Sequence, residues 1–219
     1  HLCQICAHSG GTLLVPQGAY GHFMAAAIYH GVSLRTLPTT AGNGFKLDAA
    51  SLRLACAETA CAETPQPWLY LNAPVVNPTG SVYSRAELDA LLNVARAHGI
   101  TVIMDTVFSG LEFAQAQALA LDDCSAGGSD ADTDKPLSLL LLGGISKEFA
   151  GGGLRFGYAY SRDQQLIAAL KQLRPQAPHS TLLNSVRRVY ELLLNQDAML
   201  LTDLNTQRQT LAERALRMS

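Results

Sequence analysis

Four polar residues of complementary chemistry follow strand-like segments of this sequence, and one ligand could touch all four. They are Asn77 in the turn NPTG, Asp105 at the end of ITVIMD, Lys147 after LSLLLLGG, and Arg155 at the start of RFGYAYS. A lysine amine can attack a carbonyl carbon, and a guanidinium can hold a phosphate through two parallel hydrogen bonds. The set would therefore suit an anionic ligand that also carries an aldehyde.

Each of these residues has an ordinary explanation when it is taken alone. NPTG is a good turn sequence, because proline fixes φ and glycine tolerates φ > 0. Asp105 could cap a neighbouring helix, Lys147 could be a solvated loop residue, and Arg155 could pair with a surface carboxylate. GGGLRFG has the wrong spacing for a dinucleotide-binding fingerprint, and the sequence contains no GK[ST] phosphate loop. The joint occurrence of the four residues in this order is what points to a binding site.

The elements that would position these residues alternate between strand-like and helix-like patterns. Strand-like segments occupy 12–16, 33–38, 68–74, 100–107, 136–144 and 155–161, and helical patterns occupy 19–31, 48–60 and 84–99. Such alternation predicts an α/β fold with a mostly parallel sheet and helices on both faces. The connection between 136–144 and 155–161 is too short for a crossover helix, so we expect one antiparallel strand there. In such a sheet, ligands bind at the carboxyl ends of the strands.

The order of these motifs resembles the fold type I pyridoxal-phosphate enzymes, the aspartate-aminotransferase superfamily. The matching pieces are N-P-T-G, then an aspartate that ends a strand, then S-K followed eight residues later by arginine and G-Y. The resemblance implies that pyridoxal 5′-phosphate is the cofactor. It further implies that Lys147 forms a Schiff base with the cofactor aldehyde, that Asp105 pairs with the ring nitrogen, and that Asn77 donates to the ring oxygen.

The resemblance also implies residues for the phosphate and for the face of the ring. Arg155 would hold the phosphate, and Ser146 is a second, weaker candidate. Tyr20 is the nearest candidate for the aromatic side chain that stacks on the ring, although it is displaced by about two residues from the usual place. An amino-acid substrate and a homodimer are expected on the same ground, with segment 178–181 approaching the partner's cofactor.

Two positions depart from the family's pattern. Phe108 stands where the aminotransferases usually place a tyrosine that donates to the ring oxygen, and Gly144 stands where they often place a phosphate-binding serine. These departures leave two hypotheses open. The chain belongs either to a working aminotransferase-like enzyme or to a catalytically weakened module that serves structure or regulation.

A closer resemblance covers nearly the whole chain. The segments GGTLLVPQGAYGHFMAAA, PWLYLNAPVVNPTGSVYS, VIMDTVFSGLEF and LRFGYAYS are similar to the C-terminal aminotransferase-like domain of the methionine S-methyltransferase family. The sequence shows no adenosylmethionine-binding glycine motif, so the resemblance suggests the parent protein and not methyl transfer by these residues. We expect a large domain over 1–178, with its N-terminal part lying before His1, and a helical segment over 179–219 that leads toward a small domain.

Composition restricts the remaining classes of function. The formal net charge of −2 argues against a nucleic-acid binder, which needs a basic face. No uninterrupted apolar run of about 18 residues occurs, so no membrane span is expected. Five scattered cysteines do not form a disulfide framework, and the lone pair Cys3 and Cys6 reads as two small side chains on one helix face instead of a metal site. We therefore expect no metal and a reducing, cytoplasmic location.

Overall fold

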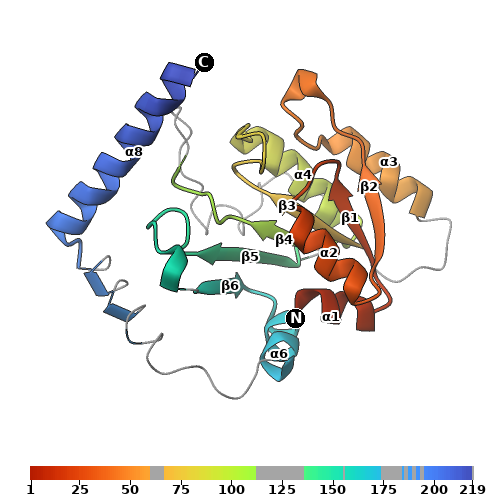
Figure 1. Cartoon of the computed structure of the whole chain (residues 1–219). Coiled ribbons are helices and arrows are strands. Elements are labelled where there is room, and N and C mark those ends of the chain that lie inside the picture. The colour runs from red at the N-terminus through yellow and green to blue at the C-terminus, as the bar shows by residue number, and fades with distance from the viewer. Residues whose placement is uncertain are drawn as a thin grey trace.

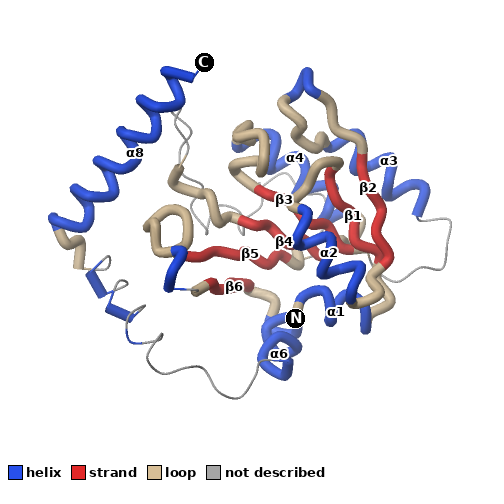
Figure 2. The backbone as a smooth tube through the Cα atoms, viewed as in Figure 1, coloured by secondary structure: helices blue, strands red, loops and turns tan. Residues whose placement is uncertain are grey.

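The computed structural model describes residues 1–59, 67–111, 136–154, 156–173, 184, 187–188, 191–192 and 195–218. Its six-stranded sheet has the order β2-β1-β3-β4-β5-β6 (Figures 1 and 2). The strands are β1 (Thr12–Pro16), β2 (Ser33–Leu37), β3 (Trp68–Asn72), β4 (Thr101–Asp105), β5 (Leu139–Gly144) and β6 (Gly157–Ser161). The helices are α1 (Leu2–His8), α2 (Gly21–Tyr29), α3 (Ala49–Thr59), α4 (Arg85–Ala97), α6 (Gln164–Leu173) and α8 (Ala198–Met218), with short 3₁₀ turns η1 (Ala41–Asn43) and η2 (Gly152–Leu154).

The sheet confirms the predicted fold class. The pairs from β2 through β5 are parallel, and only β6 runs antiparallel, against β5.

The sequence analysis did not predict helix α6, which begins directly after Asp163. The Asp163 carboxylate accepts hydrogen bonds from the backbone N–H groups of Gln165 and Leu166, and such capping satisfies donors that the first helical turn leaves unpaired.

Helices cover both faces of the sheet (Figure 1), and alternate residues of the central strands belong to two different cores. Leu69 and Leu71 of β3 belong to a core that includes side chains of α3 and α4. Trp68 and Tyr70 of the same strand belong to a second core, which includes side chains of α1, α2 and α6. This period of two is the strand geometry itself, and it divides the buried residues of β3 between the two layers. Among the described helices, none is long and apolar enough to cross a membrane.

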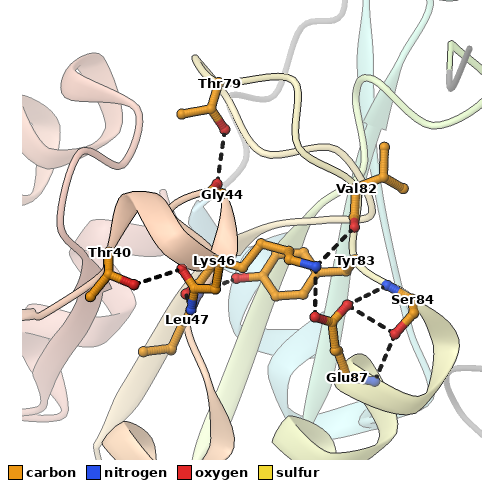
Figure 3. Close-up of polar contacts among 10 residues, drawn as sticks. Thr40, Gly44, Lys46, Leu47, Thr79, Val82, Tyr83, Ser84 and Glu87 are labelled. Atoms are coloured by element: carbon orange, nitrogen blue, oxygen red, sulfur yellow. Dashed lines mark hydrogen bonds and ion pairs between the residues drawn. The ribbon is translucent and has the colours of Figure 1, made fainter.

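Helix α4 begins with a capping box that also anchors the loop after β2 (Figure 3). The Ser84 hydroxyl accepts a hydrogen bond from the Glu87 N–H, and a Glu87 carboxylate oxygen accepts one from the Ser84 N–H at 2.7 Å. The other Glu87 oxygen binds Lys46 Nζ at 2.6 Å. The Leu47 N–H donates to the Tyr83 hydroxyl at 2.6 Å. One carboxylate therefore stabilises a helix start and ties a distant loop to it.

The charge of Glu87 should stabilise the fold in a pH-dependent way. Burial acts to raise the pKa of Glu87, but hydrogen bonds from Lys46 and Ser84 outweigh it and hold the pKa below its usual value. A depressed pKa gives stability that is present above the unfolded pKa of about 4.3 and is lost as the pH falls through the lower folded value. Glu87→Gln should lower the free energy of unfolding at pH 7 by up to about 1 kcal/mol, with a smaller difference at pH 3.

Urea unfolding at pH 7 and pH 3 measures this difference. Asp89→Asn on the same helix is the control, because it removes only a surface pair with Arg85 and should change the stability less. A Glu87→Gln deficit that is the same at both pH values would contradict the role of the Glu87 charge.

Candidate functional site

The register of the central strands aligns their carboxyl ends at one edge of the sheet. Asn72 of β3 pairs with Asp105 of β4, and Asp105 pairs with Leu142 of β5. The segments that follow these strands carry Asn77, Phe108 and Lys147. The predicted site residues Asn77, Asp105 and Lys147 therefore lie at or just beyond the same edge of the sheet, where ligands bind in α/β folds.

The Asp105 carboxylate is held by two hydrogen-bond donors. The Tyr70 hydroxyl donates to Oδ2 at 2.7 Å, and the Val107 backbone N–H donates to Oδ1 at 3.2 Å. Asn72 Nδ2 donates in turn to the Tyr70 hydroxyl oxygen at 3.2 Å. Burial, and then the negative charge of Asp105, raise the pKa of Tyr70 far above its usual value, so this hydroxyl keeps its proton and acts as a donor. Asp105 is thus an oriented carboxylate at the sheet edge.

Lys147 lies close to the loop that follows Asp105. Its side chain is exposed, and its Nζ atom lies 5.5 Å from the centre of the Phe108 ring. Phe108 is the third residue after Asp105. The Lys147 amine therefore lies against the segment that directly follows the Asp105 strand end.

The loop that carries Lys147 turns back on itself over a buried residue. Ile145 is fully buried, its carbonyl accepts a hydrogen bond from the Gly151 N–H at 2.9 Å, and the Ala150 N–H donates to the Lys147 carbonyl at 3.2 Å. Ser146 is half-buried in the same loop. The backbone is therefore fixed on both sides of the exposed lysine side chain.

An ion pair connects this loop to helix α8. Arg208 donates to Glu148 Oε1 at 2.8 Å, and Glu148 is the residue directly after Lys147. Gly110 makes room for this pair, because a Cβ atom at Gly110 would lie 2.6 Å from Glu148 Oε1. The sequence reading did not detect this pair, since its partners lie 60 positions apart.

Two largely apolar pockets flank the turn that contains Asn77. One has a volume of about 250 Å³ and is lined partly by Pro16, Gly18, Phe45, Val76 and Asn77. The other has a volume of about 270 Å³ and is lined partly by Val75, Asn77, Val82, Phe108 and Leu211. The half-buried Asn77 side chain belongs to the lining of both pockets, and Phe108, which contacts Lys147, lines the second.

Tyr20 lies at the N-terminal end of helix α2, where its ring stacks on His22 with 5.1 Å between the ring centres. Tyr20 is close enough to Tyr70 to contribute to the raised pKa of the Tyr70 hydroxyl. Gly18 occupies the place two residues earlier. It has a φ of +81°, and a Cβ atom there would meet no atom within 4 Å. The place of Gly18 therefore has room for a side chain.

The remaining sequence-based expectations have mixed outcomes. Arg155 and the segment 178–181 lie outside the described residues. Gly144 has a close neighbour, because a Cβ atom there would lie 3.0 Å from the Phe156 carbonyl oxygen.

Cys3 and Cys6 are buried in α1, and burial raises the pKa of Cys6 to about 12. Among the described residues, no group of three potential metal-binding side chains occurs.

A mostly parallel sheet with an aspartate and a lysine at the carboxyl ends of its strands is an α/β architecture that occurs in known protein families. Residues 1–218 match the family described as aminotransferase class I and II, and the chain belongs to that family. It is 35% identical over 212 residues to the methionine S-methyltransferase of Hordeum vulgare, covering 96% of this chain but 19% of that protein. The chain thus spans about a fifth of that relative's length.

Solved structures agree on the fold. An aspartate aminotransferase variant from Thermus thermophilus superposes with a TM-score of 0.74 at 21% identity, covering 95% of this chain and 52% of that chain. A PLP-bound C-S lyase from Staphylococcus hominis gives a TM-score of 0.73 at 18% identity, covering 97% of this chain and 50% of that chain. Both likenesses confirm the fold type I architecture that the sequence motifs indicated.

The return of the Lys147 loop depends on a glycine at position 151. A Cβ atom on Gly151 would lie 2.8 Å from the Ile145 carbonyl oxygen, so Gly151→Ala must displace backbone and should cost about 1–3 kcal/mol of stability. Gly153→Ala is the matched control, because a Cβ atom there meets nothing within 4 Å and the change should stay within about 0.5 kcal/mol. Equal midpoints of urea unfolding for the two variants would contradict this close approach.

Proposed function

We propose that this chain binds pyridoxal 5′-phosphate at the carboxyl edge of β3, β4 and β5. The observation that carries the proposal is the approach of Lys147 Nζ to Phe108, three residues beyond a carboxylate that two donors hold in place. These groups fit three parts of the cofactor. The amine suits the aldehyde, the oriented carboxylate suits a cationic ring nitrogen, and the amide side chain of Asn77 suits the ring oxygen. The relative from Staphylococcus hominis, which has the same fold, is described as PLP-bound.

When bound, pyridoxal 5′-phosphate supplies a carbonyl group that condenses with amines and a ring that accepts electron density from a carbanion. In this proposal the Asp105 carboxylate would hold the ring nitrogen and favour its protonated form. The Asn77 side-chain amide would donate to the ring oxygen, and the Lys147 amine would be the group that bonds the aldehyde. Tyr20 lies toward one face of the ring, and Arg155 and Ser146 are the candidates for holding the phosphate.

The substrate class that fits this site is an amino acid. The chain would be part of a protein related to the methionine S-methyltransferases, and the support for this relation is the 35% identity to the Hordeum vulgare protein over 96% of the chain. We place the boundary of the large domain near residue 178, before the helical part that includes α8. The described cysteines, Cys3, Cys6 and Cys56, are free and buried, which accords with a cytoplasmic location.

Two observations favour a second candidate, a module with weakened catalysis. Phe108 has no hydroxyl to donate to the ring oxygen, and a serine at position 144 would crowd the Phe156 carbonyl. Such a module would serve structure or regulation inside a methyltransferase-like protein. Absorbance changes of the PLP-loaded full-length protein on addition of single L-amino acids separate the two candidates, because a working enzyme alters the cofactor spectrum with its substrate.

Borohydride reduction of the PLP-loaded full-length protein should fix the cofactor onto Lys147. Addition of PLP is expected to give a yellow species, and peptide mass spectrometry after reduction should locate the adduct. Lys147→Ala should abolish the adduct, because it removes the amine. Lys171→Ala is the matched control, since Lys171 is exposed on α6, and this variant should retain the adduct. An adduct on Lys171 or Lys135 in the wild type would refute the assignment.

The full-length protein should be a homodimer at micromolar concentration. Several apolar side chains of this chain are exposed, among them Ile28 and Tyr29 on α2 at 65% and 86%, and exposed apolar surface commonly marks an interface. Sedimentation velocity with PLP present measures the assembly, and a dilution series shows whether it dissociates. A protein that stays monomeric with PLP bound throughout the series would rule out the dimer.

A further inference from the structure

We propose that Tyr70 and Asn72 are positioning residues that aim the Asp105 carboxylate at the ring nitrogen of the cofactor. The inference rests on the proposed function, because it gives Asp105 its ligand. The three side chains form one hydrogen-bonded chain, from Asn72 Nδ2 to the Tyr70 hydroxyl at 3.2 Å and from that hydroxyl to Asp105 Oδ2 at 2.7 Å.

Strand geometry alone brings these three residues to the same side of the sheet. Tyr70 and Asn72 are two positions apart on β3, so their side chains share a face. Asp105 is two positions after Ile103, and Ile103 belongs to the same core as Tyr70. The register pairs Asn72 with Asp105 and Tyr70 with Ile103. The chain of hydrogen bonds therefore runs diagonally across two paired strands and ends at the ligand edge.

Tyr70 is held rigidly enough to orient another group. The Tyr70 residue is 0% exposed, and its ring stacks on Phe23 of α2 with 4.0 Å between the ring centres and 11° between the planes. Asn72 is 6% exposed. A hydroxyl fixed in this way on one carboxylate oxygen, together with the Val107 N–H on the other, prevents rotation of the Asp105 carboxylate.

Filling the core does not require a hydroxyl at position 70. The neighbouring core residues on this face are apolar, among them Leu13, Ile103 and Leu140, and a phenylalanine would fill the same space without a polar atom to satisfy. The buried Tyr70 hydroxyl instead bonds to Asn72 and Asp105, the last residues of β3 and β4 at the site. Its placement therefore serves the carboxylate rather than the packing.

A double-mutant cycle on ligand affinity tests this role. Pyridoxine 5′-phosphate is the probe, because it keeps the ring nitrogen but has no aldehyde and cannot bond to Lys147. Tyr70→Phe should weaken its binding to the full-length protein by about 10-fold, the factor that corresponds to 1.4 kcal/mol. In the Asp105→Asn background the same change should weaken binding less than about 2-fold, because residues that act through one group are not additive.

Controls separate positioning from loss of packing. Tyr83→Phe removes the hydroxyl of another buried tyrosine, which accepts a hydrogen bond from the Leu47 N–H, and its effect on affinity should be the same in both backgrounds. Asn72→Leu removes the donor to Tyr70 and should weaken binding about 3-fold, again only when Asp105 is present. This second variant carries the test if Tyr70→Phe does not fold, as judged by circular dichroism.

The outcomes distinguish the two proposals. A wild-type protein that binds neither PLP nor pyridoxine 5′-phosphate overturns the proposed function. A wild-type protein that binds the probe, together with a Tyr70→Phe effect that is absent or equal in both backgrounds, overturns the positioning role alone. An effect confined to the Asp105-containing background supports it.

Discussion

The hydrogen-bonded register of β3, β4 and β5 is the constraint on which the site depends. Because Asn72 pairs with Asp105, β3 and β4 end at one level, and β5 continues for two residues beyond Leu142, the partner of Asp105. A shift of one residue in β4 would turn Asp105 to the opposite face of the sheet and away from the Tyr70 hydroxyl. Backbone pairing therefore decides which of these residues can share a ligand.

The two apolar layers maintain that register, and they are not equivalent. The layer against α3 and α4 contains Leu69, Leu71 and Met104, and its tyrosine, Tyr83, binds the backbone N–H of Leu47 in the loop after β2. The layer against α2 contains the ring of Tyr70, whose hydroxyl leads out to Asp105. A polar network can be tolerated there because each buried group has a partner, and an unpaired one would cost about 1–3 kcal/mol.

The sequence predicts those parts of the structure that depend on local patterns. The strands, the Ser84 cap and the turn at NPTG follow from periodicity and from residues with strong local preferences. The same patterns place Asp105 at a strand end and Lys147 just after one. The sequence does not predict Tyr70 as a site residue, because a tyrosine in the apolar strand WLYLN is typical of a core side chain. Its role depends on pairing with a strand about 30 positions away, and the Glu148 to Arg208 contact depends on a still longer separation.

The Lys147 loop combines a fixed backbone with a side chain that is free to move. Gly151 closes the loop onto Ile145, and Arg208 holds the neighbouring Glu148, so the Cα of Lys147 has little freedom. Its side chain, by contrast, is exposed, and its amine lies 5.5 Å from the centre of the Phe108 ring. A lysine that first bonds a carbonyl and later moves a proton needs this division, because the amine must change position while its attachment to the protein stays constant. The ion pair also joins the loop to α8, so that helix helps to hold the backbone that carries Lys147.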